Sequence, residues 1–345
     1  MTTGAADTKM PRTPLLYPSG MPLEQRTRSI DTAVGGLTLS GLLAEPDGEP
    51  TALIVALHGH GMTAQYFAGP AHRNSSLLEL GAALGFTVWA PDRLGYGASA
   101  GADPKSFGLF PQAEVLNTAI ERLSERYPVG AGCFLLGHSF GLKLALTMAA
   151  SPHRITLLGV DGSGSGLLYS FQPGVTRPDK HDGDLSPYWG PRDLYPPATL
   201  ASDVMLASPS AAAPMQEAVD WPDDFRSFAD RIRVPVRFTF ADHERLWRVS
   251  EEHFAALRAA LVSASRIEIQ IQRGAGHNIS LSKAARAYHL KALAFAEECV
   301  IDADRLRPPE ANRTDPTTPP VISANDVRQG ASTDPRVPRS RSSES

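Results

Sequence analysis

The sequence predicts an α/β fold in which a mostly parallel, eight-stranded sheet carries helices on both faces. Short apolar runs alternate with stretches of helical spacing between residues 28 and 302, and one such run leads through a glycine-rich turn directly into a helical stretch. Uninterrupted apolar runs are typical of parallel strands that are buried on both faces. A long interruption of this rhythm, at residues 164–228, predicts an inserted segment.

The elements follow one another in a regular order. Residues 29–34 and 37–44, joined by Gly35 and Gly36, predict a β-hairpin. Six further apolar runs predict strands and five stretches predict helices between them, an alternation that favours a sheet covered on both sides. The strands are expected at 52–57, 86–90, 132–136, 155–160, 234–240 and 266–271, and the helices at 75–84, 113–126, 142–150, 250–261 and 283–299.

Composition shifts mark the boundaries of the core. Residues 1–27 are polar and proline-rich and predict a flexible N-terminal arm, while 303–345 are poor in large apolar residues and predict a disordered tail. The core is expected to comprise 28–163 and 229–302. The insertion at 164–228 combines many prolines with many aromatic residues. The aromatic density favours a cap or lid over a disordered insert.

The length and composition are ordinary for a globular protein. Its 345 residues, 42% hydrophobic and 20% charged, leave ample room for a buried core, and a net charge of −4 gives no electrostatic reason to expect nucleic acid or an anionic membrane as a partner. Two cysteines, Cys133 and Cys299, argue against a disulfide framework. Residues 1–22 lack an apolar signal region and no segment is long enough to span a bilayer. These features predict a soluble, cytoplasmic protein.

A nucleophile elbow is the most informative motif in the chain. Residues 137–141 read Gly-His-Ser-Phe-Gly, between a predicted strand and a predicted helix. This Gly-x-Ser-x-Gly pattern places a serine in a sharp, strained turn, where a Cβ on either glycine would crowd the adjoining elements. Ser139 is therefore predicted to be a catalytic nucleophile.

A serine nucleophile needs a base, and His277 is the best placed of the ten histidines. It follows the last predicted strand in the sequence Gly-Ala-Gly-His-Asn, and the carboxyl ends of parallel strands are where the crevice of such a sheet opens. His253 and His289 fall inside predicted helices, where a packing or surface role is expected.

The acid that would orient this base has three candidates. Asp242 and Glu244 both follow the strand predicted at 234–240, and only one of them can point at His277. Asp161 follows the strand predicted at 155–160 and could also reach the crevice. An aspartate before a glycine is more typically a turn-forming residue, which is the interpretation favoured for Asp161.

Two backbone N–H groups are needed to stabilise an oxyanion. One is expected from Phe140, immediately after the nucleophile, and the other from the loop His58-Gly59-His60-Gly61 that follows the strand predicted at 52–57. The two histidines of this loop could instead suggest a metal site, but no further cluster with ligand spacing accompanies them. Neither a metal nor another cofactor is predicted.

With these motifs in place, the chain resembles the α/β-hydrolase-fold superfamily over about residues 28–300. The resemblance rests on four segments together: the His-Gly-His-Gly loop at 58–61, the stretch Pro-Asp-Arg-Leu-Gly-Tyr-Gly-Ala-Ser at 91–99, the elbow at Ser139, and Gly276-His277. The family usually carries its acid in a Gly-x-x-Asp pattern after strand seven. Here Ala241 takes the glycine place and Glu244 the aspartate place, so the resemblance favours Glu244 and leaves Asp242 as the alternate.

The resemblance also implies further roles. It makes the N–H of His60 the second oxyanion donor and Asp92 a structural turn residue, and it places the family's cap at 164–228. It implies a serine hydrolase that cleaves an ester, thioester or amide of a small-molecule acyl substrate, or alternatively a non-hydrolytic enzyme on the same scaffold, such as an acyltransferase, cyclase or lyase. A binding protein whose active site has lost its catalytic function is the weakest alternative, since the elbow, the candidate base and the candidate carboxylate are all present. Three tryptophans are expected to line the substrate pocket: Trp189, Trp221 and Trp247.

Overall fold

The computed structural model describes residues 26–69, 74–103, 108–177, 179, 181–186, 188–200 and 215–306. Nearly all of the predicted N-terminal arm and C-terminal tail lies outside the described residues, as do residues 201–214 of the predicted cap. The last helix continues to Leu306, so the first residues assigned to the tail are helical.

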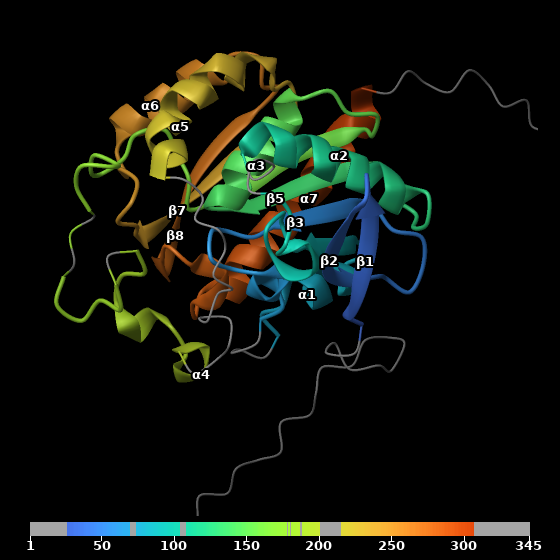
Figure 1. Cartoon of the computed structure of the whole chain (residues 1–345), viewed down its shortest axis with the longest axis horizontal. Helices are drawn as coiled ribbons and strands as arrows, with labels where there is room; N and C mark the ends of the chain where they lie inside the picture. The colour runs from blue at the N-terminus through green and yellow to red at the C-terminus, as the bar shows by residue number, and fades with distance from the viewer. Residues whose placement is uncertain are drawn as a thin grey trace, which may run out of the picture. The chain divides into compact units, whose positions relative to one another are not determined.

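The core is the predicted eight-stranded, mostly parallel sheet (Figure 1). Its strands are β1 Arg28–Val34, β2 Leu37–Ala44, β3 Leu53–Leu57, β4 Thr87–Pro91, β5 Cys133–His138, β6 Leu157–Ser163, β7 Val236–His243 and β8 Ile267–Gly276. They are ordered β1-β2-β4-β3-β5-β6-β7-β8. Only the pairings of β2, with β1 and with β4, are antiparallel among these strands. This order and the helices described next confirm the predicted α/β-hydrolase fold.

Helices cover both faces of the sheet (Figure 1). The apolar sides of α2, α3, α5 and α6 share one hydrophobic cluster, and those of α1 and α7 share the other. The bounds are α1 Leu77–Ala83, α2 Leu109–Ser124, α3 Phe140–Ala150, α4 Pro197–Leu200, α5 Met215–Phe228, α6 Glu251–Ala260 and α7 Ala285–Leu306.

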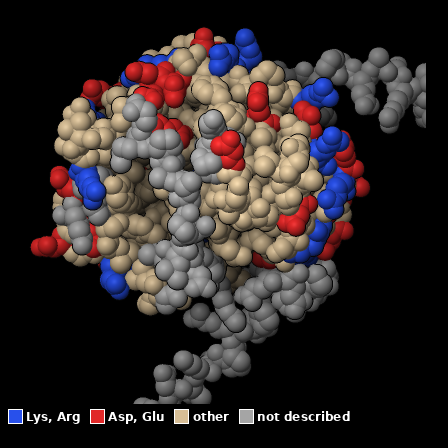
Figure 2. All heavy atoms as spheres, in the orientation of Figure 1, with Lys and Arg blue, Asp and Glu red and all other residues tan. Residues whose placement is uncertain are grey.

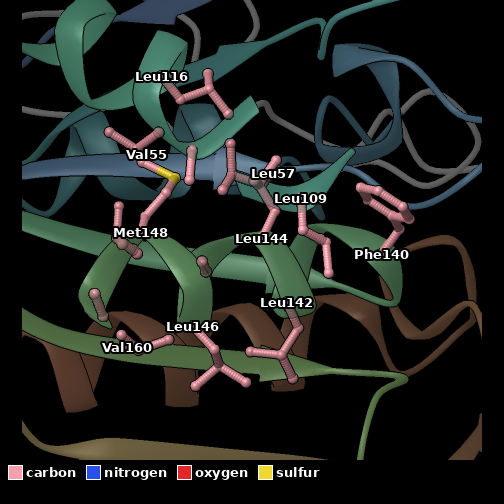
Figure 3. Packing of buried hydrophobic residues seen from close by; sticks show 14 of the residues in the cluster. Val55, Leu57, Leu109, Leu116, Phe140, Leu142, Leu144, Leu146, Met148 and Val160 are labelled. Atoms are coloured by element: carbon pink, nitrogen blue, oxygen red, sulfur yellow. The ribbon is translucent and has the colours of Figure 1, made fainter. Parts of the chain in front are cut away.

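The central strands explain why their sequences lack polar alternation. In β3, Leu53, Val55 and Leu57 belong to the cluster on the α3 side, while Ile54 and Ala56 belong to the cluster on the α7 side. Both faces of the strand are thus buried, which requires apolar residues at every position. Figure 3 shows Leu144 and Met148 of α3 gathered with Val55 and Leu57 and with side chains of α2.

Both cysteines of the chain are part of this core. Cys133 in β5 and Cys299 in α7 are 2% and 1% exposed, and both are free thiols. Burial raises the pKa of Cys299 to about 12. The two thiols are therefore unreactive in the folded protein.

The segment between β6 and β7 contains more regular structure than its sequence suggests. Besides the short α4, it holds the 14-residue helix α5, which carries Pro222 in its interior. Trp221, Phe225 and Phe228 of α5 belong to the same cluster as α3. The expectation of a segment without regular structure at 164–228 is wrong for this helix, because its apolar face packs into the main core.

On the face shown in Figure 2, lysine and arginine side chains alternate with acidic ones. Over the described part of the chain, every helix is too short or too polar to cross a bilayer.

Candidate active site

Ser139 occupies the strained turn that the motif predicts. It lies between β5 and α3 with φ 53° and ψ −116°, a left-handed backbone that a non-glycine residue seldom adopts. A Cβ on Gly141 would overlap the carbonyl of Leu57, and one on Gly137 would overlap the backbone of Leu142. The glycines therefore allow β3, β5 and α3 to approach closely enough to hold the serine at the sheet edge.

His277 and Glu244 form a buried pair at the same edge. His277 Nδ1 lies 3.0 and 3.1 Å from the two carboxylate oxygens of Glu244, and the two residues are 6% and 9% exposed. Glu244 follows β7 and His277 follows β8, strands whose ends pair at His243 and Gly276. The Nδ1–H donates to the carboxylate, which leaves Nε2 as the ring's acceptor.

The carboxylate of Glu244 is held ionised. Burial alone would raise its pKa, but the charge of His277, the hydrogen bond from His277 and the N–H groups of Arg245 and Leu246 together lower the pKa below its ordinary value. Both N–H groups donate to Oε1 at 2.9 Å. An ionised, fixed carboxylate orients the imidazole and stabilises its protonated form.

The other two candidate acids have different partners. Asp242 accepts hydrogen bonds from the N–H groups of Gly274 and Ala275, at 2.9 and 3.0 Å, and so joins the ends of β7 and β8. Asp161 lies inside β6, fully buried, and pairs with both Arg237 Nε and Nη2 at 3.2 and 2.6 Å. The turn role expected for Asp161 is wrong, because the residue is a strand residue in an ion pair.

The predicted oxyanion loop follows β3 and is ordered by its neighbours. Tyr96 Oη accepts from the N–H of Gly61 at 2.9 Å, and His58 Nε2 accepts from the N–H of Arg93 at 3.0 Å. His58 is thereby used in packing the loop. Phe140 is the first residue of α3, where a backbone N–H has no partner within the helix. Asp92 accepts from Ser40 Oγ and from the N–H of Ala64, which is the structural role expected of it.

Ser139, Phe140, His60 and His277 line one cavity of about 520 Å³. Trp189 and Trp247 also line it, whereas Trp221 is not among the lining residues. Trp221 is 1% exposed, packs against Phe225 and donates from Nε1 to the carbonyl of Gly166 at 2.7 Å. Its expected place in the pocket is therefore corrected: it is a core residue of α5.

Sequence reasoning missed His138, which links the elbow to the loop that carries His277. Its Nε2 lies 3.1 Å from Asn278 Oδ1, and its Nδ1 lies 3.1 Å from Ser163 Oγ. Burial, followed by the charge of His277, lowers the pKa of His138 well below its ordinary value, so the ring is neutral. Nε2–H then donates to Asn278, and Nδ1 accepts from Ser163. The position of His138 next to Ser139 in the motif was the available signal.

Three charged residues of the cavity were also missed. Lys143 of α3, Glu217 of α5 and the exposed Arg177 all line it. Lys143 stands one helical turn after Ser139, a spacing that could have indicated its direction. Glu217 comes from the insertion, and no local pattern connects it to the elbow.

Comparison with known proteins identifies the family of this fold. The model of the alpha/beta hydrolase family matches residues 54–289. The chain belongs to the alpha/beta hydrolase family. No curated protein matches it in sequence.

Solved structures share this family's fold at low identity. A thermostable carboxyl esterase from Bacillus coagulans is 15% identical with a TM-score of 0.59, covering 80% of this chain and 99% of its own. A monoacylglycerol lipase from Paleococcus ferrophilus is 21% identical with a TM-score of 0.52, covering 75% and 99%. The thioesterase domain from the curacin biosynthetic pathway is 16% identical with a TM-score of 0.51, covering 77% and 99%. At these identities the likeness concerns the fold.

Proposed function

We propose that this alpha/beta hydrolase is a serine hydrolase that cleaves a carboxylic ester of a small molecule through an acyl-enzyme intermediate. The observation that carries the proposal is the buried His277–Glu244 pair, 3.0 Å apart, beside a cavity that Ser139 also lines. A serine in an elbow, a base with a free Nε2 and an ionised orienting acid are the parts of a Ser-His-acid triad. The esterase and lipase among the structural neighbours favour the ester class.

In the proposed mechanism, His277 Nε2 removes the proton of Ser139 as Oγ attacks the carbonyl carbon. The carbonyl electron pair moves to oxygen, which the N–H groups of Phe140 and His60 stabilise. The C–O bond to the alcohol then breaks, and the alcohol leaves with the proton from His277. Water, deprotonated by the same base, releases the acid and regenerates Ser139. Tyr169 and Trp189 line the cavity and belong to the first part of the predicted cap, residues 164–200. In the proposed mechanism this part of the cap covers the substrate.

The decisive experiment replaces the nucleophile. Ser139→Ala should lower kcat on p-nitrophenyl esters by about 10⁴–10⁶ and abolish labelling by a fluorophosphonate, because only binding and the oxyanion donors remain. A thermal melt that matches wild type would exclude misfolding as the cause. Retention of more than about a tenth of the activity would overturn the triad. Adding an alcohol or amine acceptor to the wild-type reaction distinguishes hydrolysis from acyl transfer.

A further inference from the structure

Three charged residues that the proposed mechanism does not use line the cavity beside Ser139: the exposed Arg177, and two whose charged groups are buried. Its wall includes several aromatic residues, among them Tyr169 and Trp247, whose rings stack with centroids 3.9 Å apart. Lys143 and Glu217 lie in the same wall. Charged groups inside an apolar pocket are costly unless they are partnered, so their presence calls for an explanation.

Lys143 is buried with most of its hydrogen-bonding capacity unused. The residue is only 7% exposed, and its Nζ donates a hydrogen bond to Tyr169 Oη at 3.1 Å. The ammonium also lies 5.1 to 5.8 Å from the ring centroids of Tyr169, Trp221 and Trp247. Burial, opposed by the charge of Glu217, lowers the pKa of Lys143 to about 8. An ammonium has three donors, and the described residues provide one acceptor.

Over the residues that the structure describes, the carboxylate of Glu217 lacks hydrogen-bond donors, just as the ammonium of Lys143 lacks further acceptors. Glu217 lies in the first turn of α5, and both of its carboxylate oxygens are buried without a hydrogen-bond partner among the described residues. Burial raises its pKa to about 7, although the charges of Lys143 and Arg93 lower it in part. The two charges therefore influence each other, yet within the described part of the chain no hydrogen bond joins Lys143 to Glu217.

We propose that Lys143 and Glu217 form the polar end of the substrate cavity and bind a neutral group that is both acceptor and donor, namely a hydroxyl or a carboxamide on the substrate. This inference rests on the proposed function and names the class of substrate. The ligand's oxygen accepts from Nζ of Lys143, and its O–H or N–H donates to the carboxylate of Glu217. A plain alkyl group would leave both residues unsatisfied. A carboxylate or an ammonium would satisfy one residue and be repelled by the other.

Two series of esters test the proposal, one varied at the end of the acyl part and the other at the end of the alcohol part. In one, p-nitrophenyl hexanoates end in a methyl, hydroxyl, carboxamide, carboxylate or ammonium group; in the other, butyrate esters carry the same groups on the alcohol part. Wild type should prefer the hydroxyl or carboxamide in at least one series, by about tenfold or more in kcat/KM over methyl, as expected for hydrogen bonds to charged groups. A preference for methyl, carboxylate or ammonium in both series would overturn the proposal.

Two variants should then change which terminal group of the ester the enzyme prefers. In Glu217→Gln the repulsion of a carboxylate disappears, so carboxylate esters should gain relative to carboxamides. In Lys143→Met the ammonium esters should gain, and the preference for carboxamide over methyl should fall about tenfold. Lys283→Met and Glu252→Gln remove the same charges from exposed positions and should leave both ratios unchanged. Identical selectivity in all four variants would mean that Lys143 and Glu217 serve only the fold.

A binding measurement separates this proposal from the esterase proposal. Calorimetry with Ser139→Ala should show hexanamide or 1-hexanol binding more tightly than hexanoate or hexylammonium, whether or not any ester is hydrolysed. Absence of hydrolysis with this order retained would reject the esterase proposal alone. Hydrolysis without this order, in calorimetry and in the ester series alike, would reject the polar-end proposal alone.

Discussion

Two buried carboxylates, Asp161 and Glu244, are each paired with a basic residue of the adjacent parallel strand or its end. Asp161 pairs with Arg237 across β6 and β7, where the two residues are direct register partners within the strands. Glu244 pairs with His277 just beyond the ends of β7 and β8. The chemistry is similar, but only the second pair lies beside the cavity of Ser139.

The two pairs differ in their position along the strand and in whether the basic residue can release its proton. The Arg237 guanidinium stays charged and lies 4.4 Å from the ring of Phe295 in α7, so this pair is enclosed by the helix layer. The imidazole of His277 can gain and lose a proton, and His277 lines the cavity. In the proposed mechanism, the buried carboxylate inside a strand is therefore structural, and the one at the strand's carboxyl end takes part in the reaction.

The largest effect expected from this comparison is on turnover in Glu244→Gln. The carboxamide cannot stabilise the imidazolium of His277, so kcat should fall by about 10³–10⁴ while the protein stays folded at the assay temperature. Asp242→Asn is the matched control, because Asp242 accepts its two hydrogen bonds from the backbone of Gly274 and Ala275 and not from the imidazole of His277. If Asp242→Asn were the crippling change and Glu244→Gln stayed active, the roles would be exchanged.

The opposite pattern is expected for Asp161→Asn. It leaves Arg237 buried with half of its pairing lost, and the free energy of unfolding should fall by about 3–5 kcal/mol. Denaturant titration measures this loss, and kcat of the folded fraction should stay within a few-fold of wild type. Removing both charges in Asp161→Leu with Arg237→Met should recover much of the stability. A loss of kcat without a loss of stability would make Asp161 part of the site.

The tryptophans extend the same division between core and site. Trp221→Ala should lower the free energy of unfolding by about 3–5 kcal/mol, since it opens a cavity under α5, and leave the kcat/KM ratio between short and long p-nitrophenyl esters unchanged. Trp189→Ala should instead change kcat/KM ratios between short and long p-nitrophenyl esters by about 1–3 kcal/mol. Measuring melts and ester ratios for both variants checks the assignment. Unchanged selectivity in Trp189→Ala with a lowered melting temperature would make Trp189 a packing residue too.

The smallest effect concerns acid stability. Because the folded pKa of Glu244 is below its ordinary value of 4.5, its ionised form stabilises the fold above about pH 4.5, and this contribution disappears as the pH falls through the lower, folded value. The difference in unfolding free energy between wild type and Glu244→Gln should therefore shrink from pH 7 to below pH 4.5. Urea titrations at several pH values measure it. A constant difference would contradict the ionised pair.

The parts of the site that the sequence could predict are those held by local rules. The elbow is specified by two glycines that no larger residue could replace, so five positions were enough to predict the strained turn at Ser139. The strands were placed within a few residues because burial on both faces leaves an uninterrupted apolar run. The longest miss was β8, predicted to end at residue 271 but extending to Gly276, past a register irregularity near Asp242.

What could not be predicted depends on contacts between distant segments. Helix α5 was missed because its sequence is polar and contains Pro222, and only packing against α3 offsets that poor propensity. Lys143 is the one charged residue of α3, and Glu217, which lines the same cavity, comes from α5. Asp161 looked like a turn residue until the register placed it opposite Arg237.

The burial of both native thiols makes the protein a convenient host for spectroscopic labels. Since Cys133 and Cys299 are inaccessible in the folded chain, a cysteine introduced at an exposed position would react alone with a maleimide dye. Thr176 is exposed and lines the cavity, so Thr176→Cys would carry such a dye at its rim. Its fluorescence would report, in real time and without a chromogenic ester, when the cavity fills and empties.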